Sequence, residues 1–508
     1  MRAMSASPSM PPACPRHTST ATEAFPVSPG PMRSAILFTM CAGMFLVQLD
    51  VTVVNVALPT LGSELHADVP QLQWTVVGYS VVLAALLLTG GALGDVLGHR
   101  GVVLTGLAVF GAASAACGLA QSAGWLVAAR AVQGVGAALL LPGTMAVITG
   151  TFPGRTERAR ALGIWAGFSA LALPAGPLLG GILVQTAGWR PVFWLNVPIV
   201  AAAAVATRRM VPPDVRKPGR VDVPGAATAA LALGCGVYAV IAKTPWAGLL
   251  AVAFAVAFVV VEQRSSAPML PLSLLRSRQT AGANLVSAAM NFVGLGSVLV
   301  FTLYLQDVLH ADPIAAAVAL LPMFVPLVLV GPVSGRLTAK FGPRPQIVTG
   351  LLLGVAAMLN LLRIGTGTGY WTLLPTLFVL SVGMGLLTAA VVTASVAEAP
   401  GERAGIAGGI NNAARQAGGA LGVAVFGAVA GEPAARVSFV DGLHVLGLVS
   451  AGLWFAAAVL AVVTVRGRVR GERVDPPSPG RKPRGLGGSA PTKRRDSPET
   501  PGVPRSAP

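Results

Sequence analysis

A carboxylate lies inside a long apolar stretch near the start of the chain. Asp50 follows Gln48 and Leu49 in a hydrophobic run that begins near Ser34. A charged side chain at the centre of a bilayer costs at least about 2.5–3.5 kcal/mol on insertion scales, so an acid there is by default a candidate functional group. Of the 19 Asp and Glu residues, Asp50 alone lies well inside an apolar stretch. Its type and position indicate a proton-binding site, with a satisfied polar contact between helices as the alternative.

A basic residue, Arg130, lies at a comparable depth in another apolar stretch, 124–149. If both stretches are helices, Asp50 and Arg130 lie roughly 15 Å and roughly 10 Å from the same end, at about 1.5 Å per residue. We expect the two side chains to interact, directly or through water. A neighbouring cation favours the ionised carboxylate, whereas burial favours the protonated one. Movement of Arg130 relative to Asp50 would therefore change how readily Asp50 binds a proton.

Several polar side chains inside other apolar stretches are candidates for lining a substrate pathway. They are Asn55, Gln133, Asn196, Asn291, Asn411 and Arg415. Their amide and guanidinium groups can form hydrogen bonds to a small molecule. For Arg415, hydrogen bonds to helix carbonyls are the favoured alternative, because a buried cation must find partners.

The elements that position these residues must cross a membrane. Hydrophobic residues make up 54% of the 508 residues, charged residues only 11%, and the mean hydropathy is +0.71, which excludes a soluble globular protein. Apolar runs of helical spanning length recur, and the strict alternation of a membrane β-barrel is absent. We predict an all-α polytopic membrane protein with fourteen spans. The spans are 34–60, 72–93, 102–121, 124–149, 160–186, 191–211, 223–242, 246–262, 280–305, 314–335, 346–364, 371–395, 405–430 and 443–465.

The basic residues are distributed unevenly between the two ends of these spans. The net charge is +17, but connections after even-numbered spans hold 16 Lys and Arg residues and those after odd-numbered spans hold only 4. Because positive loops stay in the cytoplasm, both termini are predicted to be cytoplasmic, as an even number of spans also requires. The net charge of +17 is explained by basic cytoplasmic connections and tails that lie near membrane lipid. We therefore expect no nucleic-acid partner.

The chain divides into five predicted regions. Residues 1–33 form a disordered cytoplasmic N-terminus, and residues 466–508 a disordered basic cytoplasmic tail that is attracted to anionic lipid. Residues 34–211 form a first six-helix bundle and residues 280–465 a second one. Residues 212–279 form a linker that contains two extra membrane helices without a candidate coupling group.

Catalytic and metal-binding patterns are absent from the sequence. The cysteines Cys14, Cys41, Cys117 and Cys235 are scattered, and no H-E-x-x-H, G-x-S-x-G or G-x-x-x-x-G-K-[ST] occurs. We therefore expect no enzyme, no metal and no cofactor.

Five motifs carry a resemblance to a known family. The motif Gly91-x-Leu93-x-Asp95-x-x-Gly98-x-Arg100 resembles the loop signature of the major facilitator superfamily, and Arg130–Gly136 resembles its fourth-helix motif. The segment 173–181, with Pro174, Gly176, Pro177, Gly180 and Gly181, is similar to the fifth-helix motif of drug-exporting antiporters. The segments 49–59 and 188–198 resemble those of the fourteen-span drug:proton antiporter branch.

The resemblance implies a major facilitator fold of two six-helix bundles, with the two extra helices inserted between them. It implies alternating access in a cell membrane, and proton-coupled efflux of lipophilic drugs or antibiotics by a protein that functions as a monomer and is driven by the proton gradient. A proton-linked carrier for a nutrient, a siderophore or another metabolite is the alternative.

The motif residues have expected roles of their own. Gly91, Asp95, Gly98 and Arg100 would form a conformational gate, with Asp95 facing the positive end of the helix 405–430. The proline and glycine cluster at 174–181 is expected to break the helical hydrogen bonding and to form a close packing face between the two bundles. A second copy of the loop at 335–344 has Ala339 in place of Asp95, so coupling is expected in the N-terminal half.

Overall fold

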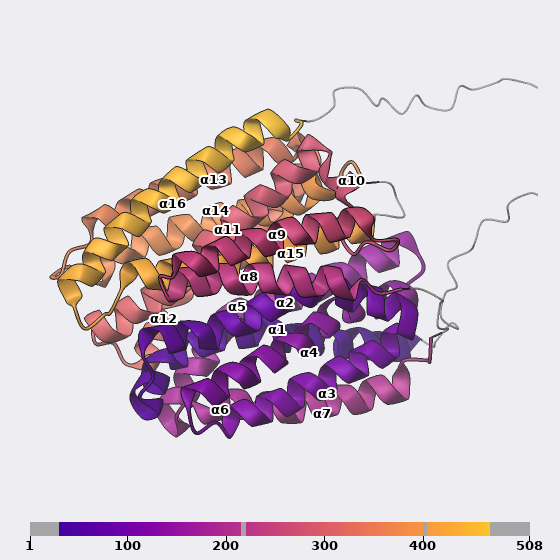
Figure 1. The fold of residues 1–508 in the computed structure, drawn as a ribbon, viewed down its shortest axis with the longest axis horizontal. Coiled ribbons are helices and arrows are strands. Elements are labelled where there is room, and N and C mark those ends of the chain that lie inside the picture. The colour runs from indigo at the N-terminus through magenta and orange to yellow at the C-terminus, as the bar shows by residue number, and fades with distance from the viewer. Residues whose placement is uncertain (1–29, 215–219, 400–403, 468–508) are drawn as a thin grey trace, which may run out of the picture. The chain divides into compact units, whose positions relative to one another are not determined.

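The computed structural model contains fourteen helices that are long and apolar enough to cross a membrane. It describes residues 30–214, 220–399 and 404–467, and all regular structure in these ranges is helical, which confirms the predicted all-α class and the number of spans. The α-helices are α1 Gly30–Leu65, α2 Val69–Leu97, α3 His99–Gly118, α4 Ala123–Thr151, α5 Arg155–Ala187, α6 Arg190–Trp194, α7 Asn196–Met210, α8 Val223–Ile241, α9 Pro245–Arg264, α10 Leu272–Leu275, α11 Arg278–Leu303, α12 Pro313–Phe341, α13 Pro343–Leu359, α14 Tyr370–Val396, α15 Ala404–Ala430 and α16 Arg436–Thr464 (Figure 1).

Polar caps and glycine turns set the ends of several spanning helices. At the start of α2, the Gln71 backbone N–H donates to Asp68 Oδ1 at 2.9 Å and the Asp68 backbone N–H donates to Gln71 Oε1 at 3.2 Å, a reciprocal capping box. Gly98 between α2 and α3 has a φ of 94°, and Gly342 between α12 and α13 has a φ of 84°. Residues with a Cβ disfavour this conformation. The two copies of the loop motif therefore share the same turn glycine.

The helices form two groups that pack mainly among themselves. In the first group, α1 packs on α4, α5 and α7, while α2 and α3 both pack on α4. In the second group, α11 packs on α14, α15 and α16, and α14 also packs on α12 and α13. The groups meet where α2 packs on α15 and α5 packs on α12. The extra pair α8 and α9 lies on the outside of the boundary between the groups, because α8 packs on both α2 and α15 while most of both helices is not buried (Figure 1).

Two helices differ from the expectation. The predicted span 191–211 consists of two short helices, α6 and α7, which adjoin at Leu195. The prediction that Pro174 and Pro177 break the helical hydrogen bonding is wrong, because α5 continues as one helix from Arg155 to Ala187. Neighbouring helices can support a membrane helix through a proline, and α5 packs along α1 and α12.

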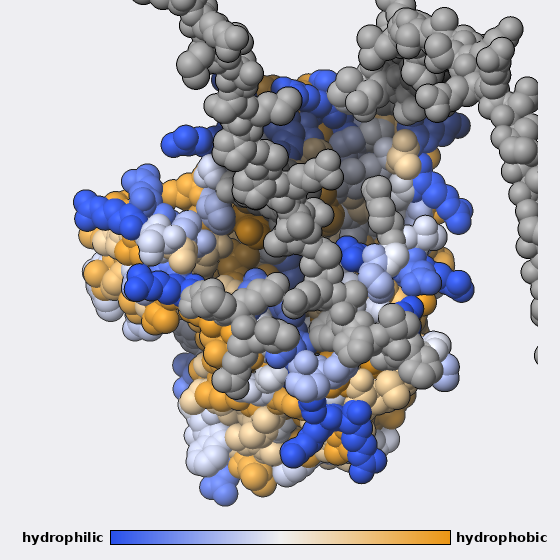
Figure 2. All heavy atoms as spheres, turned by 90° about the vertical axis from the view of Figure 1, so that its right-hand side faces the viewer, coloured by the Kyte–Doolittle hydropathy of each residue, from blue (hydrophilic) through white to orange (hydrophobic). Residues whose placement is uncertain are grey.

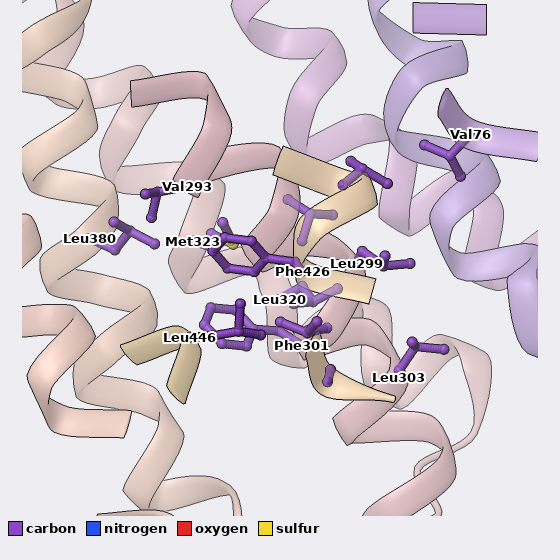
Figure 3. Packing of buried hydrophobic residues seen from close by; sticks show 14 of the residues in the cluster. Val76, Val293, Leu299, Phe301, Leu303, Leu320, Met323, Leu380, Phe426 and Leu446 are labelled. Atoms are coloured by element: carbon purple, nitrogen blue, oxygen red, sulfur yellow. The ribbon is translucent and has the colours of Figure 1, made fainter. Parts of the chain in front are cut away.

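Bulky side chains fill the second group of helices. Phe301 of α11, Leu320 and Met323 of α12, and Phe426 of α15 are all buried and lie close together in one hydrophobic cluster (Figure 3). Close packing of this kind fixes the helices of the group relative to one another. The buried members of a second hydrophobic cluster all lie in the first group and the residue directly after it, Val211.

One end of the helices carries most of the basic connections. This basic end holds the start of α1, the Gly98 and Gly342 turns, α10 and the end of α16. Viewed from this end, hydrophilic residues stand around the rim and hydrophobic residues cover the flanks (Figure 2). The distribution is that of a helical bundle whose sides contact lipid and whose end contacts water.

Candidate functional site

Asp50 lies on α1 in the middle of the first helix group and is fully buried. Its Oδ2 atom accepts a hydrogen bond from Arg130 Nη1 of α4, and the two side chains form an ion pair. Its Oδ1 atom accepts from Gln133 Nε2 at 2.8 Å and from Asn196 Nδ2 at 3.3 Å. Both carboxylate oxygens of Asp50 therefore have hydrogen-bond donors.

Arg130 is held by groups from several helices. Its Nε atom donates to the Thr75 carbonyl of α2 at 3.0 Å, and its Nη1 atom also donates to Gln133 Oε1 at 2.7 Å. The guanidinium carbon lies 4.4 Å from the centre of the Tyr79 ring, within the range of a cation–π contact. A buried guanidinium with this many partners has a defined position.

Gln133 connects the ion pair to two further helices. It lies three residues after Arg130, so both side chains project from one face of α4. Its Nε2 atom donates to Ser114 Oγ of α3 at 2.9 Å, and Asn196 Nδ2 of α7 donates to the same hydroxyl at 3.3 Å. We call Asp50, Arg130, Gln133, Asn196 and Ser114 the Asp50 network; all five are buried.

The remaining pathway candidates lie outside the Asp50 network. Asn55 is buried and donates from Nδ2 to the Val51 carbonyl of its own helix at 2.8 Å, while its Oδ1 atom has no partner. Asn291 of α11 is also buried. Because Asn55 is five residues from Asp50, it projects from a different side of α1.

A separate polar cluster lies between α11 and α15. Asn411 Nδ2 donates to Asn284 Oδ1 at 3.0 Å and to Ser287 Oγ at 2.7 Å. Arg415 lies one turn further along α15, and its buried Nε atom has no hydrogen-bond partner. The sequence candidates therefore separate into a first-group site around Asp50 and a second-group cluster around Asn411.

The gate motif forms the turn between α2 and α3. Asp95 is exposed and pairs with His99, with 3.5 Å between Asp95 Oδ1 and His99 Nε2. Within the described ranges no hydrogen bond or ion pair joins Asp95 to α15, and its expected place opposite the positive end of that helix stays a prediction. The Arg100 backbone N–H donates to Asp214 Oδ2 at 2.9 Å, which ties this turn to the segment after α7.

The glycines of the α5 motif permit close approach to two partners. A Cβ at Gly176 would overlap the Thr52 side chain, and a Cβ at Gly180 would lie 2.9 Å from the Val53 carbonyl oxygen. Both contacts are with α1, directly after Asp50. A Cβ at Gly181 would lie 2.7 Å from the Pro313 carbonyl oxygen of α12. Only this last contact joins the two helix groups, so the motif mainly sets the packing of α1.

Sequence reasoning did not identify several residues that support the site. Ser114 and Thr75 were not singled out, because a hydroxyl or a backbone carbonyl in a span has no distinguishing pattern. Glu64 was also missed. Its Oε2 atom accepts from Trp189 Nε1 at 2.8 Å and from Arg190 Nη1 at 3.1 Å, which fixes α1 to α6 at the end opposite the basic end.

The described ranges contain no group of three or more His, Cys, Asp or Glu side chains that could hold a metal ion. The polar atoms of the Asp50 network bind one another, and its charges are one acid and one base. Such an arrangement can exchange a proton and can rearrange when Asp50 is neutralised.

The chain is similar to proteins of known family. A sequence model of the Major Facilitator Superfamily matches residues 40–423 and 284–496. A methylenomycin A resistance protein from Streptomyces coelicolor is 36% identical over 399 residues, which cover 77% of this chain and 84% of that protein. A tetracenomycin C resistance and export protein from Streptomyces glaucescens is 36% identical over 409 residues, 77% of this chain and 74% of that protein.

Further relatives extend the comparison. A multidrug resistance protein Stp from Mycobacterium tuberculosis is 34% identical over 412 residues, 78% of this chain and 76% of that protein. Among solved structures, a crystal structure of the peptide transporter POT with sulfate has a TM-score of 0.65 at 17% identity, and covers 85% of this chain and 95% of that chain. At that identity the likeness concerns the fold alone.

Proposed function

Since this chain belongs to the major facilitator superfamily, we propose that it exports lipophilic drugs or antibiotics across the cell membrane in exchange for protons, by alternating access. The family consists of membrane transporters and not enzymes. The relatives described above are named for resistance to, or export of, antibiotics and other drugs. The proline and glycine motif of α5, which includes Pro174 and Pro177, also resembles a motif typical of exporters.

The buried ion pair between Asp50 and Arg130 is the observation that carries the proposal. A proton that reaches Asp50 removes its charge and so removes the electrostatic attraction to Arg130. The guanidinium then favours other partners, which biases the packing of α1 against α4. Proton binding at Asp50 is in this way converted into a preference for one arrangement of the helices, as alternating access requires.

The contacts between the helix groups support a state that is closed at the end opposite the basic end. Gln306 Nε2, in the π-helix Tyr304–Val308 after α11, donates to the Val56 carbonyl of α1 at 3.2 Å. The Ile314 backbone N–H of α12 donates to Gln185 Oε1 of α5 at 3.3 Å. In the proposed cycle these contacts break when the site opens to the other side.

The proposal includes an orientation and a set of partners. The basic end faces the cytoplasm, so that both termini are cytoplasmic and the basic connections lie near anionic lipid. The protein works as a monomer on a small lipophilic substrate and takes its energy from the proton gradient, without a metal or another cofactor.

Transport in reconstituted vesicles tests the proposal. In vesicles that expose the basic end outward, an acidic lumen should drive drug accumulation, because protons leave as drug enters. A panel of lipophilic antibiotics would be supplied as substrates, and Asp312→Asn, which retains an exposed helix cap on α12, serves as the control variant. Accumulation driven only by an alkaline lumen would indicate proton-linked uptake of the symport type and would contradict the proposal.

A further inference from the structure

Two carboxylates lie buried side by side in the extra helix pair, outside the Asp50 network. Asp222 immediately precedes α8 and Glu262 lies in the last turn of α9, both at the basic end. Asp222 is 6% exposed and Glu262 is 4% exposed. Fully buried acids are rare unless they have partners, so this pair requires an explanation.

Each acid uses one of its two oxygen atoms. Asp222 Oδ1 accepts from the Gly225 backbone N–H at 2.8 Å, and Glu262 Oε2 accepts from the Leu270 backbone N–H at 3.1 Å. The other two oxygens, Asp222 Oδ2 and Glu262 Oε1, are buried without a hydrogen-bond partner. Each lies 2.9 Å from the point that a Cβ on Gly225 would occupy. The two free oxygens thus converge on one small space above this glycine.

No cation balances the two acids within the described ranges. Neither forms an ion pair there. The flanking Arg220 and Arg264 are exposed, as is Arg276 in the connection to α11. On the helices that pack against α8, Asp95 of α2 pairs with His99, and Arg415 of α15 forms no ion pair with either acid.

The other titratable side chains of α8, Cys235 and Tyr238, lie near its opposite end, three to four turns away from Asp222 at about 3.6 residues per turn. Within the described ranges, none of these groups forms an ion pair with Asp222 or Glu262. Two ionised carboxylates at close range in a buried site repel each other, and each also leaves one oxygen unsatisfied.

One shared proton removes both problems. We propose that Asp222 and Glu262 hold a single proton between them at neutral pH, and so form a second proton-binding site that is independent of Asp50. The protonated oxygen of one acid donates to the free oxygen of the other, and the pair carries one negative charge in place of two. Close carboxyl pairs in other proteins share protons for the same electrostatic reason.

The shared proton stabilises the segment that follows α9, which contacts α2 of the first helix group. Glu262 holds the backbone of Leu270, and the preceding Met269 accepts a hydrogen bond at its Sδ atom from Thr89 Oγ1 of α2 at 3.4 Å. Segment 265–271 is therefore fastened to α9 and to the basic end of α2. Loss of the proton would restore the repulsion between Asp222 and Glu262 and loosen this attachment.

Infrared difference spectroscopy of the purified protein in lipid, without any substrate, tests the proposal. Spectra recorded between neutral and alkaline pH should show the signal of one protonated carboxyl group, which the double substitution Asp222→Asn with Glu262→Gln abolishes. Each single substitution removes the repulsion between the two carboxylates, so the remaining acid should lose its proton at a lower pH than the pair does. Asp222→Asn should still fold, because Asn is as good a helix cap as Asp. Asp50→Asn and the helix-cap control Asp312→Asn should retain the signal.

A second measurement uses thermal unfolding. Because the folded pair binds a proton that the unfolded chain has released at neutral pH, stability should fall as pH rises through the titration of the pair. The fall should be absent in the double variant, should begin at a lower pH in each single variant and should be unchanged in Asp312→Asn. A carboxyl signal that survives the double substitution, that is unchanged in both single variants, or that depends on an added sodium or magnesium salt would overturn the shared proton. No outcome of these measurements depends on drug transport.

Discussion

Asp50 of α1 and Arg130 of α4 form an ion pair that is closed off from solvent, although 80 residues separate them in the chain. Three further side chains, Gln133, Asn196 and Ser114, complete the hydrogen bonds around the pair. The site is therefore assembled from four helices, and a change in the charge of Asp50 is felt by all of them.

Removal of the Arg130 charge should abolish proton-driven transport. Arg130→Gln leaves Asp50 buried without a cation, and breaking a buried ion pair on one side costs about 3–5 kcal/mol. A proton on Asp50 would then no longer change an attraction to α4, so proton binding could not bias the helices. Drug uptake into vesicles with an imposed pH gradient should fall to background, whereas drug exchange without a gradient should persist. Full proton-driven uptake by Arg130→Gln would show that the pair has no part in coupling.

Gln133→Leu should weaken the Asp50 network. Gln133 donates to Asp50 Oδ1, and a hydrogen bond to a charged group contributes about 1.5–3 kcal/mol. Its loss leaves Asn196 as the one remaining donor to Asp50 Oδ1, so the melting temperature and proton-driven drug uptake should both decrease. Thr144→Val is the matched control, because this buried hydroxyl on α4 bonds only to the Leu141 carbonyl of its own helix. Equal melting temperature and uptake for Gln133→Leu and Thr144→Val would contradict the role of the Gln133 amide.

Gly176→Ala should disturb the packing of α1 beside Asp50. The added methyl group would overlap Thr52 and would lie 3.0 Å from the Val53 backbone nitrogen, so the helices must separate. Overpacking of this kind costs about 1–3 kcal/mol. Melting temperature and drug uptake should both decrease. Gly163→Ala in the same helix is the control, since a Cβ there meets no atom within 4 Å. Equal behaviour of the two variants would refute the close approach of α5 and α1.

Gly98→Ala should destabilise the turn between α2 and α3. With φ 94° and ψ 132°, this backbone conformation is strained for alanine by about 1–3 kcal/mol. The new Cβ would also lie 3.3 Å from Asp214 Cβ. Gly342→Ala should have a similar effect in the second copy of the turn. Gly101→Ala lies inside α3 with open space around it and should be neutral or slightly stabilising. Thermal unfolding in detergent should give lower melting temperatures for Gly98→Ala and Gly342→Ala than for Gly101→Ala.

The number of spans and the approximate depth of Asp50 and Arg130 were predictable from the sequence. Both follow from one-dimensional information, namely the length of apolar runs and the rise per residue of a helix. The sequence left open whether Asp50 and Arg130 interact directly or through water. The structure resolves this choice because it defines which faces of α1 and α4 meet.

Contacts that depend on helix faces and on connections could not be predicted. The sequence places Asp222 and Glu262 at the ends of separate spans, and only the antiparallel packing of α8 on α9 brings them together. The pairing of Asp95 with His99 depends on the orientation of the Gly98 turn. The role of Ser114 depends on the rotation of α3, which apolar composition does not determine when a helix is hydrophobic on all sides.

The central claim is that Asp50 carries the proton that is exchanged for drug. The most direct measurement is proton release from purified protein in weakly buffered solution when a transported drug is added. Wild-type protein should release protons on drug binding, and Asp50→Asn should bind the drug without releasing any. Undiminished proton release from Asp50→Asn would place the exchanged proton elsewhere and contradict the account.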